Sequence, residues 1–181
     1  MTNALDREMV RRAADQEWQL AGLRARGPVP SLRRRLRLFG QFVGDWKIHE
    51  PGSPRAAPDE RSSGEVRFRW VLGGTAVQDI WGPFDSDTGK LVPEGTTLRF
   101  YDPSIRAWRS TWISPYQRVV RRFIGREEAG EIVLREQDAG WKGENWIFSD
   151  ISHASFRWRA ETRASPHARP RVTEEYLIRR T

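Results

Sequence analysis

Hydrophobic and polar residues alternate along most of the chain after residue 42. Between Val66 and Leu72, large apolar side chains occupy every even position, whereas Arg67 and Arg69 occupy odd ones. Successive side chains of a β-strand point to opposite faces, so this pattern predicts a strand with one buried face. The same alternation recurs at Leu98–Tyr101, Trp108–Ile113, Val119–Ile124, Ile132–Glu136, Trp146–Phe148, Phe156–Thr162 and Val172–Arg180.

Turn signals separate these segments at regular spacing. Gly73-Gly74 predicts a tight hairpin, Asp85–Lys90 a longer loop, and Asp102-Pro103-Ser104 another turn. The count comes to about nine or ten short strands with no helical segment after residue 42. We therefore predict a mainly β fold, a closed antiparallel barrel or a sandwich. The Pro- and Gly-rich stretch 51–58 is expected to form an extended loop between the first two strands, where it could act as a lid.

The first forty residues have a helical period instead. Apolar residues recur at helical spacing over residues 4–25, and Gly27–Pro30 then breaks the chain. Ser31 is a good N-cap for a short second helix with Leu36 and Phe39 on one face. The predicted organisation is an N-terminal helix and linker over residues 1–30, followed by one β-barrel domain over 31–181.

Two ends of the chain resemble the calycins, the lipocalins and their relatives. Gly44-Asp45-Trp46 is a Gly-x-Trp sequence entering the first strand, and the last strand ends in Arg179-Arg180. In calycins, an arginine of the last strand commonly covers the tryptophan at the closed end of the barrel. The resemblance implies that Arg179 or Arg180 covers Trp46, with a slight preference for Arg179, and that any functional site lies toward the opposite end.

A closer resemblance is to a bacterial family of lipocalin-like proteins of unknown function. It covers roughly residues 36–181 and implies a barrel architecture without implying an activity. The order and spacing of short motifs carry it: Phe42–Trp46, Arg69–Gly74, Gln78-Asp79, Tyr101–Pro103 and Trp108–Trp112.

Composition limits the chemistry and the cellular compartment expected for this barrel. The 181 residues contain no cysteine, which excludes disulfides, thiolate metal sites and cysteine nucleophiles. Charged residues crowd the first dozen positions, and we see no signal peptide or long apolar span. Together with the absence of cysteine, this favours a cytoplasmic protein.

The net charge of +7 is unevenly distributed along the chain. Residues 1–40 hold nine arginines against four acidic residues, while the barrel segment is nearly neutral. An arginine-rich leader could contact nucleic acid or an anionic membrane, but charge runs are more often solvated helix faces. Because the aromatic residues alternate as core residues do, we expect neither a nucleic-acid nor a membrane partner.

Tryptophan is the strongest compositional signal, with nine residues, seven of them in expected strands. Indole, hydroxyl and amide groups lining a barrel suit a small hydrophobic or aromatic metabolite, although the same tryptophans could fill a solid core. The expected ligand-binding residues are Phe68, Trp70, Trp81, Phe100, Trp112 and Tyr116.

Asp79 is the main candidate for chemistry. It lies in a strand that otherwise reads as apolar, and either it or Gln78 faces the interior. A carboxylate buried in an apolar cavity could act as a general acid or base. Alternatively, Asp79 pairs with Arg67 or Arg69 on the neighbouring strand. His49, Tyr101 and Tyr116 complete the catalytic candidates.

No cofactor or metal is expected. His49, His153 and His167 show no metal-ligand spacing, and neither a nucleophile-elbow motif nor a phosphate-binding glycine loop is present. Three hypotheses follow: a barrel that binds a small ligand; a barrel isomerase, cyclase or lyase; and an interaction protein that forms homodimers through its arginine-rich N-terminal helices.

Overall fold

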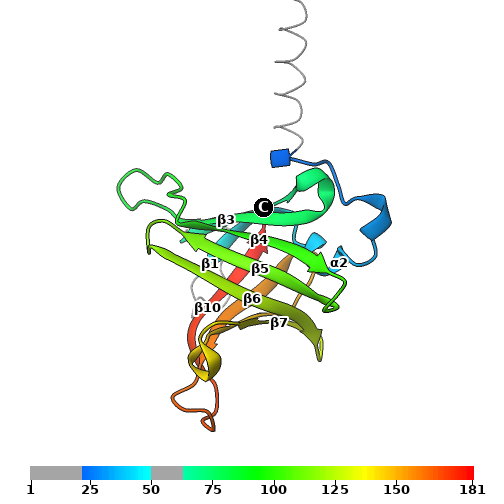
Figure 1. Ribbon diagram of the computed structural model, residues 1–181. Coiled ribbons are helices and arrows are strands. Elements are labelled where there is room, and N and C mark those ends of the chain that lie inside the picture. Colours follow the sequence, from blue (N-terminus) through cyan, green and yellow to red (C-terminus); the bar gives the residue numbers. More distant parts are fainter. Residues whose placement is uncertain (1–21, 50–62) are drawn as a thin grey trace, which may run out of the picture.

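A computed structural model describes residues 22–49 and 63–181, and these form a closed barrel of antiparallel strands (Figure 1). The ten strands of the described chain follow one another around the barrel, and β1 closes it against β10. They are β1 (Gly44–His49), β2 (Gly64–Val71), β3 (Ala76–Pro83), β4 (Gly95–Asp102), β5 (Ala107–Ser114), β6 (Val119–Glu128), β7 (Glu131–Glu136), β8 (Asn145–Ser149), β9 (Ser155–Thr162) and β10 (Arg171–Arg180).

This architecture confirms the predicted mainly β fold and its closed antiparallel barrel. Each strand pairs with its neighbour in sequence, as hairpins and short loops require, and only β1 and β10 pair over a long separation. Closure leaves no strand with an unpaired edge, which removes the tendency of open sheets to pair with other chains. No helix among residues 22–49 and 63–181 is both long and apolar enough to cross a membrane.

One end of the barrel is filled by the chain that leads into β1. A single 3-10 turn at Pro30–Leu32 and the short helix α2 (Arg37–Gly40) lie at this closed end (Figure 1). Leu36, Phe39 and Phe42 are completely or almost completely buried there. The Phe39 ring lies 4.9 Å from Trp108, and the Phe42 ring 4.7 Å from Phe156, measured between centroids. This half of the barrel is therefore a solid aromatic core.

One expectation about the chain before β1 is contradicted by the structure. The predicted N-cap at Ser31 is wrong: the turn begins one residue earlier, at Pro30, whose fixed φ suits the first helical position and whose missing N–H costs nothing there. The helix predicted over residues 4–25 and the proposed lid at 51–58 fall almost entirely outside the described residues.

Residues 25–29 are attached to the barrel, since the N–H groups of Ala25 and Val29 donate to the carbonyls of Trp70 and Gly74.

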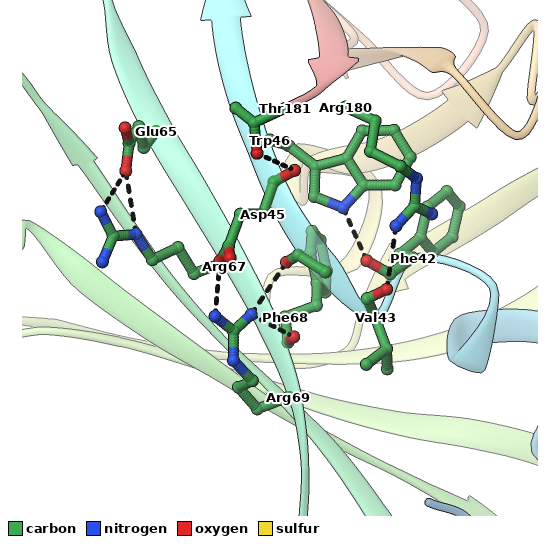
Figure 2. A network of polar contacts seen from close by, with 11 residues as sticks. Phe42, Val43, Asp45, Trp46, Glu65, Arg67, Phe68, Arg69, Arg180 and Thr181 are labelled. Carbon is green, nitrogen blue, oxygen red and sulfur yellow. Dashed lines mark hydrogen bonds and ion pairs between the residues drawn. The ribbon is translucent and has the colours of Figure 1, made fainter.

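Trp46 and Arg180 seal the closed end, as the resemblance implied, but the partner is not the slightly preferred Arg179 (Figure 2). The Arg180 guanidinium lies 4.0 Å from the centroid of the Trp46 ring. Its three nitrogens donate to the carbonyls of Gln41, Val43 and His153, while Trp46 Nε1 donates to Phe42 at 2.6 Å. Register decides between the two arginines, because Arg180 pairs directly with Trp46 and Arg179 with Lys47.

Gly44 makes this arrangement possible. Its φ of +144° is a backbone conformation that residues with a side chain rarely adopt. A Cβ at this position would also collide with the Nη1 atom of Arg180. The glycine of the Gly-x-Trp sequence therefore leaves room for the arginine that covers the tryptophan.

Candidate functional site

The half of the barrel away from α2 contains a cavity of about 190 Å³. Ten side chains toward the open end and eight deeper ones line it. The deeper set consists of Val66, Phe68, Asp79, Thr97, Arg99, Phe148, Phe156 and Ile178, and the outer set of Trp81, Glu94, Trp112, Gln117, Arg121, Glu144, Trp146, Trp158, Glu174 and Tyr176. The barrel is thus filled at one end and hollow toward the other, where the sequence placed the site.

Five aromatic rings surround the outer half of the cavity, and we call them the aromatic collar. In order of contact they are Trp112, Trp146, Trp158, Tyr176 and Trp81, with neighbouring centroids 5.4–5.9 Å apart. Trp158 and Tyr176 stack at 28°, and the other neighbouring pairs are tilted or edge-to-face. Four of the nine tryptophans therefore line a cavity rather than a solid core.

A buried ion pair forms the inner wall of the cavity. The carboxylate of Asp79 accepts from Nη1 of Arg99, and its other oxygen accepts from the backbone N–H of Thr97 at 3.1 Å. Asp79 is 4% exposed and Arg99 3%. The guanidinium lies 5.1–5.9 Å from the ring centroids of Phe39, Phe68 and Phe148, so the pair joins the aromatic core to the cavity.

The expected pairing of Asp79 with Arg67 or Arg69 is wrong. Cross-strand register places Ile80 beside Arg67 and Gln78 beside Arg69, both on the outer face, while Asp79 lies beside Phe68 on the inner face. Asp79 is the inward residue of the Gln78-Asp79 pair. Its partner comes from the other neighbouring strand, β4, where Thr97 is its direct cross-strand neighbour and Arg99 follows on the same face.

The outer half of the cavity is charged. Glu144 accepts from Arg121 and from Trp146 Nε1, the latter at 2.8 Å. Glu94 accepts from Gln117. Within the described part of the chain, the side-chain carboxylate of Glu174 has no hydrogen-bond or ion-pair partner. Burial raises the pKa of Glu174, and the nearby carboxylates of Glu144 and Glu94 raise it further, against an opposing effect of Arg121.

The structure gathers only some of the residues that the sequence singled out for binding. Phe68, Trp81 and Trp112 line the cavity. Trp70 lies instead in the core near the closed end, against Gly40. Phe100 faces outward and is 43% exposed, and Tyr116 lies in the β5–β6 turn at 81% exposure.

The catalytic candidates are dispersed in the same way. Asp79 is the only one of the four that lines the cavity. Tyr101 lies near the closed end, under the guanidinium of Arg35 and beside Trp108. His49 ends β1 on the face opposite Trp46. These positions do not form one catalytic group. Among the described residues, no three histidine or acidic side chains are grouped as metal ligands would be.

Sequence reasoning missed Arg99, Trp146, Trp158, Tyr176 and the three glutamates of the cavity. A signal was available for the last strand, because Glu174, Tyr176 and Ile178 alternate onto one face. For Glu94 and Glu144 there was none, since each precedes a strand at the end of a loop and only closure of the barrel brings them together.

Fold and site together define a calycin-like antiparallel β-barrel with an aromatic, acidic interior cavity. Compared with models of known protein families and with curated proteins, the sequence matches neither a family nor a protein.

Proposed function

We propose that this barrel binds a small, largely apolar or aromatic molecule in the cavity surrounded by the aromatic collar. The cavity itself carries this proposal. Protein interiors are close-packed, and large side chains fill the barrel interior at the α2 end, where the hollow lined by Arg33, Arg37 and Gln41 is an open surface groove. A void lined by four indoles and a phenol is a favourable site for flat apolar surface.

The size of the cavity limits the ligand. Pockets for drug-sized molecules typically measure about 300–1,000 Å³, and this one measures about 190 Å³. A molecule with one or two rings suits that space. The proposal also includes membership of the bacterial lipocalin-like family, whose resemblance to this chain implies the barrel architecture and no activity.

Binding is favoured over catalysis by the state of Asp79. Both of its oxygens are already engaged, by Arg99 and by the backbone of Thr97. These contacts make the carboxylate part of the structural ion pair at the inner wall. Of the four residues that the sequence singled out for catalysis, only Asp79 lines the cavity, so they do not form an acid–base pair there.

Titration of intrinsic tryptophan fluorescence tests this proposal. The panel would contain one- and two-ring molecules of neutral, anionic and cationic type, with isothermal titration calorimetry as the second readout. We expect at least one member to shift the emission of the collar tryptophans. Thr97→Leu places a larger side chain on the cavity wall while keeping the backbone N–H that Asp79 accepts, and it should weaken binding about tenfold or more.

The matched control is Thr111→Leu, the same substitution on the outer face of β5. It should leave affinity unchanged. If no member of the panel changed the emission or released heat, or if Thr97→Leu and Thr111→Leu bound alike, the cavity would not be the binding site.

The homodimer hypothesis also stays open to test. Because residues 25–29 are bonded to the barrel, the deletion should stop at residue 21. We expect a chain lacking residues 1–21 to assemble from fewer subunits than the full chain, as measured by multi-angle light scattering. An equal number of subunits in both would contradict a role of these residues in assembly.

A further inference from the structure

The charge of the cavity is opposite to that of the protein. The chain carries a net charge of +7, yet the cavity lining contains four carboxylates against two guanidinium groups. Arg99 is neutralised by Asp79, and Arg121 by Glu144. Glu94 and Glu174 form no ion pair with any residue that the structure describes, and both lie toward the open end beside the aromatic collar.

Glu174 is the most informative of these groups. Its strand position places it on the inner face with Tyr176 and Ile178, at the solvent-exposed mouth of the cavity. No described residue forms a hydrogen bond or an ion pair with its carboxylate, although Arg121 is near enough to oppose the rise of its pKa. An ionised carboxylate beside the carboxylates of Glu144 and Glu94 is unfavourable unless a positive charge joins it. Among residues 22–49 and 63–181, no cationic side chain forms an ion pair at this position.

The aromatic collar provides the second half of a cation site. Indole and phenol rings attract cations over their faces, and the attraction is strongest when the cation is desolvated. Trp81 and Tyr176 lie 5.4 Å apart between centroids, and Tyr176 is two residues from Glu174 on the same face of β10. Aromatic faces and an unpaired carboxylate therefore meet at one part of the cavity.

Two buried polar atoms at and behind the inner wall lack a hydrogen-bond partner. Nε of Arg99 and Oγ of Ser110 are buried, and neither has a hydrogen-bond partner in the described structure. The two residues are direct cross-strand partners on β4 and β5, and both face inward. Buried polar atoms are almost always paired, so these two neighbouring exceptions leave the polar side chains beside the Arg99–Asp79 pair incompletely satisfied.

From these observations, and on the basis of the function proposed above, we infer that the ligand is a small organic cation. It would carry an amine or quaternary ammonium group on an apolar body of one or two rings. The ammonium lies against Glu174, Glu94 and the collar, and the apolar body occupies the space between the collar and the Arg99–Asp79 pair.

Three probes of matched shape and different charge test this inference: 2-phenylethylamine, 2-phenylethanol and 3-phenylpropionate. Tryptophan emission would be excited at the red edge of the indole band, where the phenyl ring does not absorb, and calorimetry would confirm each affinity. At neutral pH the amine is a cation, and we expect it to bind about tenfold or more tightly than the alcohol, with the carboxylate weakest.

Glu174→Gln and Glu175→Gln form the matched pair of variants. Both remove one negative charge from β10 with little change of shape, but Glu175 faces outward toward Arg157. Glu174→Gln should weaken binding of the amine roughly three- to tenfold and leave the alcohol unchanged. Glu175→Gln should change neither.

The outcomes separate this inference from the proposed function. If the alcohol bound as tightly as the amine, or the carboxylate bound best, the cavity would bind ligands but the cationic ligand class would be wrong. Equal affinities of the two glutamine variants for the amine would contradict the role of Glu174. Failure of all three probes to bind would count against the proposed function as well.

Discussion

Arg99 and Asp79 form an ion pair inside the barrel, between the aromatic core and the cavity. It joins two neighbouring strands through their inward-facing side chains, where most other large residues are aromatic. Charges in such a place are stable only together, because each alone would lose its hydration without compensation.

Removing one member of this pair should therefore lower the free energy of unfolding far more than removing a surface charge. We expect Asp79→Asn to lower the free energy of unfolding by about 3 kcal/mol, measured by urea denaturation, because Arg99 would remain buried without a counter-charge. The control is Asp45→Asn, which removes the partner of Arg69 on the exposed outer face and should cost about 1 kcal/mol or less. The double variant Asp79→Leu/Arg99→Met should recover much of the loss. Equal costs for the two single variants would contradict a buried, mutually dependent pair.

The Gly44–Arg180 contact gives a second prediction about stability. Gly44→Ala combines an unfavourable φ with a collision against the guanidinium, and we expect a loss of about 2–4 kcal/mol in thermal or urea unfolding. Gly89→Ala is the control. Gly89 also has a positive φ, of +65°, but no atom lies near its hypothetical Cβ, so only the backbone cost of about 1 kcal/mol should remain. If the two variants were equally stable, Arg180 would not restrict residue 44.

Ligand binding should depend on pH through Glu174. Its pKa is raised by burial first and then by Glu144 and Glu94, so it ionises above its ordinary value of 4.5. A permanent cation such as phenethyltrimethylammonium should bind more tightly as pH rises through that raised pKa, because the ligand itself does not titrate. In Glu174→Gln this step should be absent from the affinity–pH profile. An identical profile in the variant would assign the pH dependence to other groups.

The same shift has an opposite consequence for the unliganded protein. A carboxyl whose pKa is raised on folding holds its proton more tightly in the native state than in the unfolded state. Its stabilising contribution is complete below the unfolded pKa and is lost as pH rises through the folded pKa. Above that range, the free energy of unfolding of Glu174→Gln should exceed that of the wild type in denaturation curves. A wild type more stable than the variant would show that Glu174 has a favourable partner in the native state.

Asp102 provides a test of local electrostatics in the Tyr-Asp-Pro turn. Hydrogen bonds from the Ser104 hydroxyl, at 2.6 Å, and from Arg109 Nε, at 2.7 Å, lower its pKa to about 2. Its contribution to stability is therefore present above the unfolded pKa of about 3.9 and lost as pH falls through about 2. Carboxyl chemical shifts followed by NMR should show this titration. Ser104→Ala should raise the pKa of Asp102 and leave that of Asp85 unchanged, because Asp85 is bonded by Thr88.

The amino-acid sequence by itself determined the fold class. Alternation of apolar and polar residues depends only on the two-residue period of a strand, and turn residues mark where each strand ends. These local properties predicted the succession of strands and left a closed barrel or a sandwich open, between which the resemblance to calycins favoured the barrel. The Gly-x-Trp sequence and the terminal arginines gave its sealed end, although only cross-strand register distinguishes Arg180 from Arg179.

Where the pattern of apolar and polar residues is ambiguous, the tertiary structure decided which face of a strand points into the barrel. In β4, Leu98 and Phe100 are the apolar positions, and the sequence placed Phe100 in the ligand site. The inward face instead carries Thr97, Arg99 and Tyr101, because the Asp79 carboxylate on β3 offers Arg99 a buried partner. Hydrophobicity alone cannot anticipate an ion pair between residues that are twenty positions apart.

The cavity and its charge were likewise beyond the reach of the sequence. Seven tryptophans in strands fit a filled barrel as well as a hollow one, since the choice depends on how side chains from all strands meet at the centre. Glu94, Glu144 and Glu174 come from three distant segments and become neighbours only when β1 closes on β10. The barrel was specified residue by residue along the chain, whereas the binding site exists only in the closed assembly of its strands.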